Sequence, residues 1–154
     1  MFKIIFIHPN FPAQFRHLAY YLGQNPKNQI YYITANPRPE WKIPGVEKVI
    51  YNRPSPSISQ KIEDFINHGK AVAQVLIRLK KHFLPDLIYA HSGWGSSLFI
   101  NDIYPDTPFL GYFEWYYNAD GADITFGSIQ PSIQQAMNLR LKNFPILSDL
   151  IACT

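Results

Sequence analysis

The chain has 154 residues, 47% hydrophobic and 16% charged, so it is long enough for the core of one ordinary domain and too short for two. Lys and Arg number 14 against 11 Asp and Glu, and this net charge of +3 argues against a dedicated nucleic-acid binder with a dense basic surface. The single cysteine, Cys153, excludes an intramolecular disulfide and a cysteine-rich zinc site, which fits a reducing compartment.

No segment of the sequence has the pattern of a signal peptide or a membrane span. The apolar run at residues 2–7 is too short for a signal sequence and leads directly into Pro9. No stretch approaches the roughly 20 apolar residues that a spanning helix needs.

The first third of the chain predicts a strand, a helix and a second strand. Residues 2–7 form a continuous apolar run, which is typical of a parallel strand covered on both faces. Apolar side chains at helical spacing then follow Pro12 as far as Leu22, and residues 29–34 form a β-branched and aromatic run. This order implies a right-handed crossover between two parallel strands.

The middle of the chain contains a proline-rich excursion followed by a long amphipathic helix. Five prolines between residues 35 and 57 leave only residues 48–51 as a short third strand. Apolar side chains then recur at steps of three and four over residues 58–83, which predicts a helix with one apolar face. The basic patch at its end, listed as Arg78, Lys80, Lys81 and His82, is either a solvated surface or a peripheral contact with anionic lipid.

The rest of the chain continues the alternation of strands and helices. Residues 86–91 and 108–113 predict the fourth and fifth strands, separated by a short helix over residues 96–104. A helix is expected over residues 131–144, stopped by a proline, and residues 149–153 predict a sixth strand. The expected fold is a single α/β domain: a doubly wound, mostly parallel six-stranded sheet, Rossmann-like, with strand order 3-2-1-4-5-6. A strand at the very end suggests one half of a larger unit.

Three loops after predicted strands collect the candidate site residues. Ligands of open α/β sheets bind outside the carboxyl ends of the strands. The residues at these positions are His8, Asn10 and Phe11, then His91, Ser92, Gly93 and Trp94, then Glu114, Trp115 and Tyr116. Rings flanked by hydrogen-bonding groups suit a polyhydroxylated ligand, whose C–H faces pack on them. The alternative is that the rings cover the sheet end or dock on a partner.

His91 is the candidate catalytic residue. At the end of a strand and before Gly-Trp-Gly, it is placed to take a proton from a substrate hydroxyl or to hold that hydroxyl. The alternative is a buried histidine bonded to a backbone carbonyl, and the same choice is open for His8. The free backbone N–H groups of residues 93–97 predict an anion-binding site.

Other chemistries fit the sequence poorly. The loop after the first strand has no glycine, so the usual dinucleotide fingerprint is absent, and no Walker phosphate loop occurs. The sequence around Ser92 is similar to the nucleophile elbow of hydrolases, but Trp94 stands where that motif needs a small residue. These enzymes also place their catalytic histidine after the serine, and no histidine follows Ser92. Glu114 and Asp120 could act as a pair of catalytic carboxylates, but the sequence does not determine the distance between them.

Three segments together resemble the amino-terminal domain of a bacterial subgroup of family 4 glycosyltransferases. They are residues 7–18 (Ile-His-Pro-Asn-Phe-Pro-Ala-Gln-Phe-Arg-His-Leu), residues 91–95 (His-Ser-Gly-Trp-Gly), and residues 110–117 (Leu-Gly-Tyr-Phe-Glu-Trp-Tyr-Tyr) followed by Gly121-Ala122-Asp123. The resemblance implies a GT-B enzyme, in which two Rossmann-like domains face each other across a cleft. Residues 1–154 would be the acceptor-side domain, and the carboxyl-terminal donor-binding domain lies outside this chain.

The resemblance also implies an activity and its partners. It implies transfer from a nucleotide sugar to a sugar or lipid-linked acceptor with retention of configuration, without a tightly bound cofactor or metal, in the cytoplasm or at the inner membrane face. His91 would lie near the transferred sugar, and the loop after the first strand would approach the donor phosphates. Many members have glycines where Asn10, Phe11 and Pro12 stand here. We expect this fragment alone to be inactive; the competing hypothesis is a non-catalytic Rossmann-like binding or interaction module.

Overall fold

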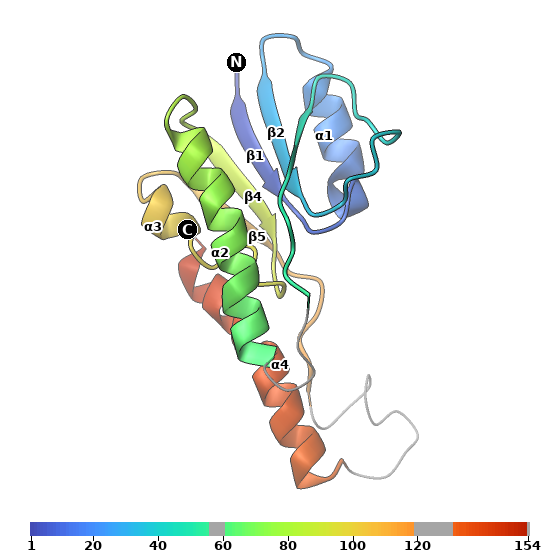
Figure 1. Ribbon diagram of the computed structural model, residues 1–154, viewed down its shortest axis with the longest axis vertical. Coiled ribbons are helices and arrows are strands. Elements are labelled where there is room, and N and C mark those ends of the chain that lie inside the picture. Colours follow the sequence, from blue (N-terminus) through green and yellow to red (C-terminus); the bar gives the residue numbers. More distant parts are fainter. Residues whose placement is uncertain (56–60, 119–130, 154) are drawn as a thin grey trace.

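A five-stranded parallel sheet forms the centre of the computed structural model, which describes residues 1–55, 61–118 and 131–153 (Figure 1). The strands stand in the order β3-β2-β1-β4-β5, and every neighbouring pair is parallel. Their bounds are β1 Lys3–Ile7, β2 Gln29–Thr34, β3 Glu47–Ile50, β4 Leu87–His91 and β5 Phe109–Tyr112. The expected α/β, Rossmann-like class and the order of the first five strands are confirmed.

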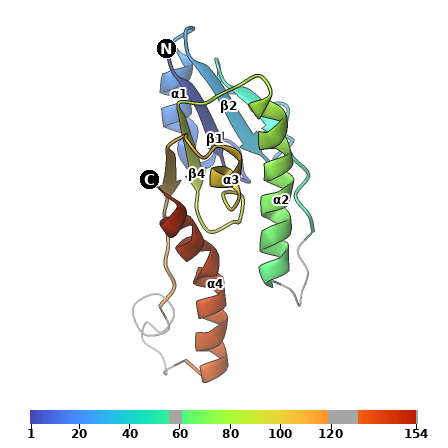
Figure 2. The same ribbon diagram turned by 90° about the vertical axis from the view of Figure 1, so that its left-hand side faces the viewer.

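Helices cover both faces of this sheet (Figure 2). On one face lies α1 (Arg16–Gly23), which continues the short 3-10 helix η1 (Ala13–Phe15). The other face carries α2 (Lys61–Lys80) and the single turn α3 (Ile100–Ile103). The part of the predicted long helix at residues 58–60 lies outside the described residues.

The continuous apolar run of β1 is explained by these two layers. Ile5 and Ile7 enter a cluster with α2 side chains such as Val72, whereas Ile4 and Phe6 enter a cluster with Phe15 of η1. Successive side chains of a strand point to opposite faces, so a strand between two helical layers has no polar position. These four residues of β1 are all buried, and only Lys3 at its start is partly exposed.

The predicted sixth strand is wrong. Residues 149–152 belong to α4 (Ile133–Ala152), which continues through Pro145. Proline removes one helical hydrogen bond and usually kinks or ends a helix, but tertiary contacts hold this one together. Pro145, Ile146 and Asp149 are buried on one side of the helix, at helical rather than alternating spacing.

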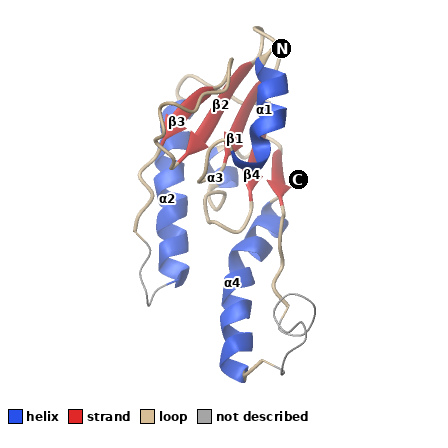
Figure 3. Cartoon of the chain, turned by 90° about the vertical axis from the view of Figure 1, so that its right-hand side faces the viewer, coloured by secondary structure: helices blue, strands red, loops and turns tan. Residues whose placement is uncertain are grey.

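The start of α4 also differs by two residues from the expected position at Pro131. Ser132 accepts a hydrogen bond from the Gln135 backbone N–H, and the Gln135 side chain accepts one from the Ser132 N–H. This reciprocal capping box satisfies two backbone donors at the helix start. The first half of α4 extends beyond the carboxyl edge of the sheet (Figure 3). No helix in the described part of the chain combines the length and the apolar character needed to cross a bilayer.

Candidate functional site

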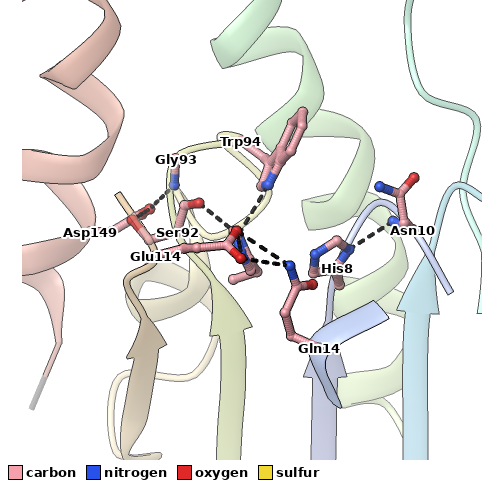
Figure 4. A network of polar contacts seen from close by, with 9 residues as sticks. His8, Asn10, Gln14, Ser92, Gly93, Trp94, Glu114 and Asp149 are labelled. Carbon is pink, nitrogen blue, oxygen red and sulfur yellow. Dashed lines mark hydrogen bonds and ion pairs between the residues drawn. The ribbon is translucent and has the colours of Figure 1, made fainter. Parts of the chain in front are cut away.

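The carboxyl ends of β1, β4 and β5 bring three predicted site residues together. The imidazole rings of His8 and His91 have centroids 4.6 Å apart. The Nε2 atom of His91 lies 3.2 Å from the Oε2 atom of Glu114, which is labelled in Figure 4 together with His8. Residues that are 23 to 106 positions apart in sequence thus share one rim because their strands are parallel neighbours.

His91 has a partner for each ring nitrogen. Its Nδ1 atom lies 3.0 Å from the indole Nε1 of Trp94 and 2.9 Å from the carbonyl oxygen of Ser92. A neutral ring with its proton on Nε2 donates to Glu114 and accepts from the Trp94 N–H. A doubly protonated ring donates to Glu114 and to the Ser92 carbonyl instead. Both nitrogens are therefore oriented by the protein in either state.

Glu114 is the exposed carboxylate of this group. The Gln14 side-chain amide donates to both of its oxygens, at 3.1 and 3.3 Å. This bond, followed by the hydrogen bond and the charge of His91, holds the pKa of Glu114 below its ordinary value. Glu114 is therefore a carboxylate at neutral pH. Gln14 was not among the predicted site residues, although it lies within the resembling segment 7–18.

His8 is buried, and its ring is neutral. The backbone N–H of Asn10 donates to its Nδ1 atom at 2.8 Å, which places the ring proton on Nε2. Burial, together with the neighbouring His91, lowers the pKa of His8 to about 4. Its Nε2 atom has no hydrogen-bond partner within residues 1–55, 61–118 and 131–153.

The expected anion-binding site at residues 93–97 is occupied by a carboxylate of the chain itself. Asp149 of α4 accepts from the Ser92 hydroxyl at 2.8 Å, the Gly93 N–H at 3.1 Å and the Ser97 hydroxyl at 2.6 Å. Burial raises the pKa of Asp149, while these three donors oppose that shift. Asp149 was missed because the sequence placed it in a strand. Ser92, predicted to bind the acceptor, is buried and donates to Asp149.

Two pockets adjoin at this rim and share His91, Trp94 and Glu114. The smaller, of about 350 Å³, is also lined by Ser92, Gly93, Phe113, Trp115, Tyr117, Lys142 and Ile146. The larger, of about 570 Å³, is also lined by His8, Asn10, Phe11, Ala13, Gln14, Asn36, Arg38 and Trp41. Tyr116 lines neither; it lies in a third pocket against α4. Except for Tyr116, all the predicted residues thus border one of the two adjoining pockets.

Several residues that border these pockets were not predicted. Asn36, Arg38 and Trp41 come from the proline-rich excursion after β2, and Lys142 comes from α4. Asn36 follows the predicted second strand by two residues, so the rule that singled out the other loops applies to this one as well. The exposed Trp41 among prolines was a further signal, since a large ring in a loop often marks a contact surface. Lys142 lies in a helix, and no strand end precedes it.

Other predicted features lie away from this site or outside the description. Lys80 and Lys81 of the basic patch line a separate pocket of about 870 Å³ between α2 and α3. Asp120 and the resembling residues 121–123 lie outside the described residues. Within the described ranges, no three His, Cys, Asp or Glu side chains lie close enough to hold a metal ion.

Comparisons with known proteins give both structural and sequence matches. UGT2 of Phytolacca americana, solved with UDP-2-fluoro-glucose and pterostilbene, aligns over 72% of this chain and 30% of its own, with 10% identity and a TM-score of 0.47. CalG4, the calicheamicin glycosyltransferase, aligns over 99% of this chain and 40% of its own, with 17% identity and a TM-score of 0.47. The chain therefore spans less than half the length of either protein.

No curated protein sequence matches the chain. The sequence model of one family, the glycosyl transferase family 4 group, matches residues 26–154. This match covers most of the chain and includes two of the three predicted site loops, those after β4 and β5. The chain belongs to the glycosyl transferase family 4 group.

Proposed function

We propose that this domain is the acceptor-binding half of a retaining glycosyltransferase that uses a nucleotide sugar and acts in the cytoplasm on a sugar or lipid-linked acceptor. The observation that carries the proposal is the position of His91. It stands on the shared wall of two aromatic-lined pockets, held between Glu114 and Trp94. The donor-binding half would be a second domain of the natural protein. Membership of the family supports this assignment.

The acceptor hydroxyl would bind beside His91 and Glu114 and replace the 3.2 Å contact between them. The Nε2–H of His91 donates to the hydroxyl oxygen, and the hydroxyl proton is donated to the Glu114 carboxylate. As the oxygen bonds to the anomeric carbon of the sugar, the bond from that carbon to the nucleotide phosphate breaks and the proton leaves to Glu114. Gln14 and Trp94 act as positioning residues, because each orients one of the two reacting side chains.

Substitution of His91 tests this role. In the natural protein that contains this domain, we expect His91→Ala to lower transfer about 10²- to 10⁴-fold, because it removes the group that orients the hydroxyl. The matched control is His17→Ala, since His17 is exposed on α1. Circular dichroism and initial rates with a panel of nucleotide sugars are the measurements. Near-normal turnover by a folded His91→Ala protein would remove His91 from the mechanism.

The 154-residue chain should bind an acceptor without transferring sugar to it. Multiple turnovers by this chain alone would contradict the proposed division between two domains. One observation favours a second candidate, a non-catalytic interaction module: Trp115 and Tyr116 are about half exposed, at 49% and 48%. The coding sequence downstream of Thr154 separates the two, since a second α/β domain supports the transferase and an immediate stop supports the module.

A further inference from the structure

The segment Asn36–Trp41, which follows β2, forms a fixed wall of the larger pocket. The Lys48 ammonium donates to the carbonyls of Arg38 and Trp41, at 2.5 and 3.1 Å. The Asn36 side-chain oxygen accepts from the Arg38 N–H at 3.1 Å, and the Asn36 N–H donates to the Thr34 hydroxyl at 3.1 Å. Both ends of the segment are therefore tied to the edge of the sheet.

Arg38 presents an unused guanidinium at this wall. Its Cζ atom lies 4.7 Å from the centroid of the Trp41 ring. A guanidinium on an aromatic ring keeps the N–H groups at its edge available for a planar acceptor. No other described side chain forms a hydrogen bond or an ion pair with it, and both Arg38 and Trp41 are exposed.

Among the described residues, Arg38 has no ion-pair partner. Glu114 is the one carboxylate among the lining residues, and it already accepts from Gln14 and interacts with His91. Three further cations lie over rings at the rim. The Arg53 Cζ atom is 5.2 Å from the centroid of the Trp94 ring, and the Nζ atoms of Lys142 and Lys48 are 3.9 and 4.7 Å from the centroids of Tyr117 and Phe11. The described cations around the pocket therefore outnumber the one carboxylate that lines it.

We propose that Arg38 binds the acidic group of the acceptor, which is therefore a sugar that carries a carboxylate or a phosphate. A planar guanidinium recognises either group through two parallel hydrogen bonds. The exposed side-chain amide of Asn10, which lines the same pocket, supplies a partner for a neighbouring hydroxyl. The inference rests on the proposed function, because it takes the larger pocket to hold the acceptor that meets His91.

Binding of matched sugars to the 154-residue chain tests this inference without a donor. The indole N–H signals of the ¹⁵N-labelled chain report on both pockets, since Trp41, Trp94 and Trp115 line them. The probes are methyl β-D-glucuronide against methyl β-D-glucoside, and glucose 6-phosphate against glucose. We expect one acidic sugar to bind about tenfold more tightly than its neutral partner, and the pair that shows this preference identifies the acid.

Three variants and one competitor complete the test. Arg38→Gln should abolish the preference, Arg38→Lys should retain part of it, and Arg78→Gln on the exposed face of α2 should leave it unchanged. Equal binding of acidic and neutral sugars, or a preference that survives Arg38→Gln, would overturn the inference. So would displacement of the acidic sugar by UDP, because Arg38 would then bind the phosphates of the donor. The proposed function fails on a different result, the unchanged turnover of His91→Ala.

Discussion

Asp149 accepts three hydrogen bonds with one buried carboxylate, and all three donors belong to the loop that carries Trp94. Trp94 in turn donates to His91. The position of His91, the proposed catalytic residue, thus depends on an acid in a distant helix that lines neither pocket of the proposed site.

Removal of this acid should loosen the loop. We expect Asp149→Ala to lower the free energy of unfolding by about 2–3 kcal/mol, because it leaves buried donors unpaired. The penalty is smaller than three charged hydrogen bonds suggest, because the variant also removes the cost of burying a carboxylate. Urea unfolding of the 154-residue chain measures the change. Asp102→Ala, on the exposed side of α3, is the control, and equal stabilities of these two variants would contradict the prediction.

The sequence places some site residues and not others for a simple reason. His91 and Glu114 follow strands directly, so the alternation of elements predicts the edge of the sheet at which they lie. Gln14 and Asp149 lie in helical segments, and their side chains reach the site only through tertiary packing. Periodicity reports which face of an element is buried, but not which polar group on that face meets which neighbour.

The connection between β4 and α3 is the element that joins the site to α2. Gly93 and Gly95 both adopt positive φ, at 88° and 82°. A methyl group on Gly95 would lie 2.4 Å from the backbone oxygen of Phe65 in α2, whereas one on Gly93 would meet only the Ile146 side chain, at 3.3 Å. The two glycines therefore differ in packing and share the same backbone requirement.

Alanine variants of the two glycines therefore distinguish the cost of backbone strain from the cost of a clash with α2. We expect Gly93→Ala to lower the free energy of unfolding by about 1–2 kcal/mol, which is the cost of a left-handed alanine. Gly95→Ala should lower it by clearly more, because α2 must also move away from the loop. Urea unfolding of the two variants side by side is the measurement. Equal losses would show that the loop can move away from α2 freely.

The end of α4 shows why the sequence pattern wrongly predicts a sixth strand. Residues 150–153 form an unbroken apolar run after a proline, which is typical of a buried strand. The structure instead buries Ile146 and Asp149, and leaves Leu150 and Ile151 exposed. The hydrogen bonds to Asp149 fix this last part as a helix, and no local signal in the sequence announces them.

Acid should destabilise the whole molecule through two histidines in different layers. His8 packs against Phe15 on the α1 side, and His68 of α2 lies 2.5 Å from the Tyr51 hydroxyl on the other side. Burial lowers the pKa of each to about 4; the charge of His91 adds to this for His8, and that of Arg53 for His68. The unfolded chain takes up these protons near pH 6.5. Stability therefore falls as the pH decreases from about 6.5 to about 4.

We expect each buried histidine to lower the free energy of unfolding by about 2 kcal/mol at pH 5 relative to pH 7.5. Urea unfolding at the two pH values measures the loss. His8→Gln should remove about half of the pH dependence, and His17→Gln, at an exposed position, should leave it unchanged. A wild-type chain of equal stability at both pH values would contradict the assignment of two neutral rings.

Two oxygens flank His91, one on Glu114 and one on the Ser92 backbone. Their positions bear on the rate of turnover. Each faces a different ring nitrogen, so the imidazole is held in one orientation. A side chain that need not rotate during turnover leaves little rearrangement in the rate-limiting barrier. If the proposed donor-binding domain exists, its approach would then be the slow event of the proposed catalytic cycle, and added viscogen should slow turnover in proportion.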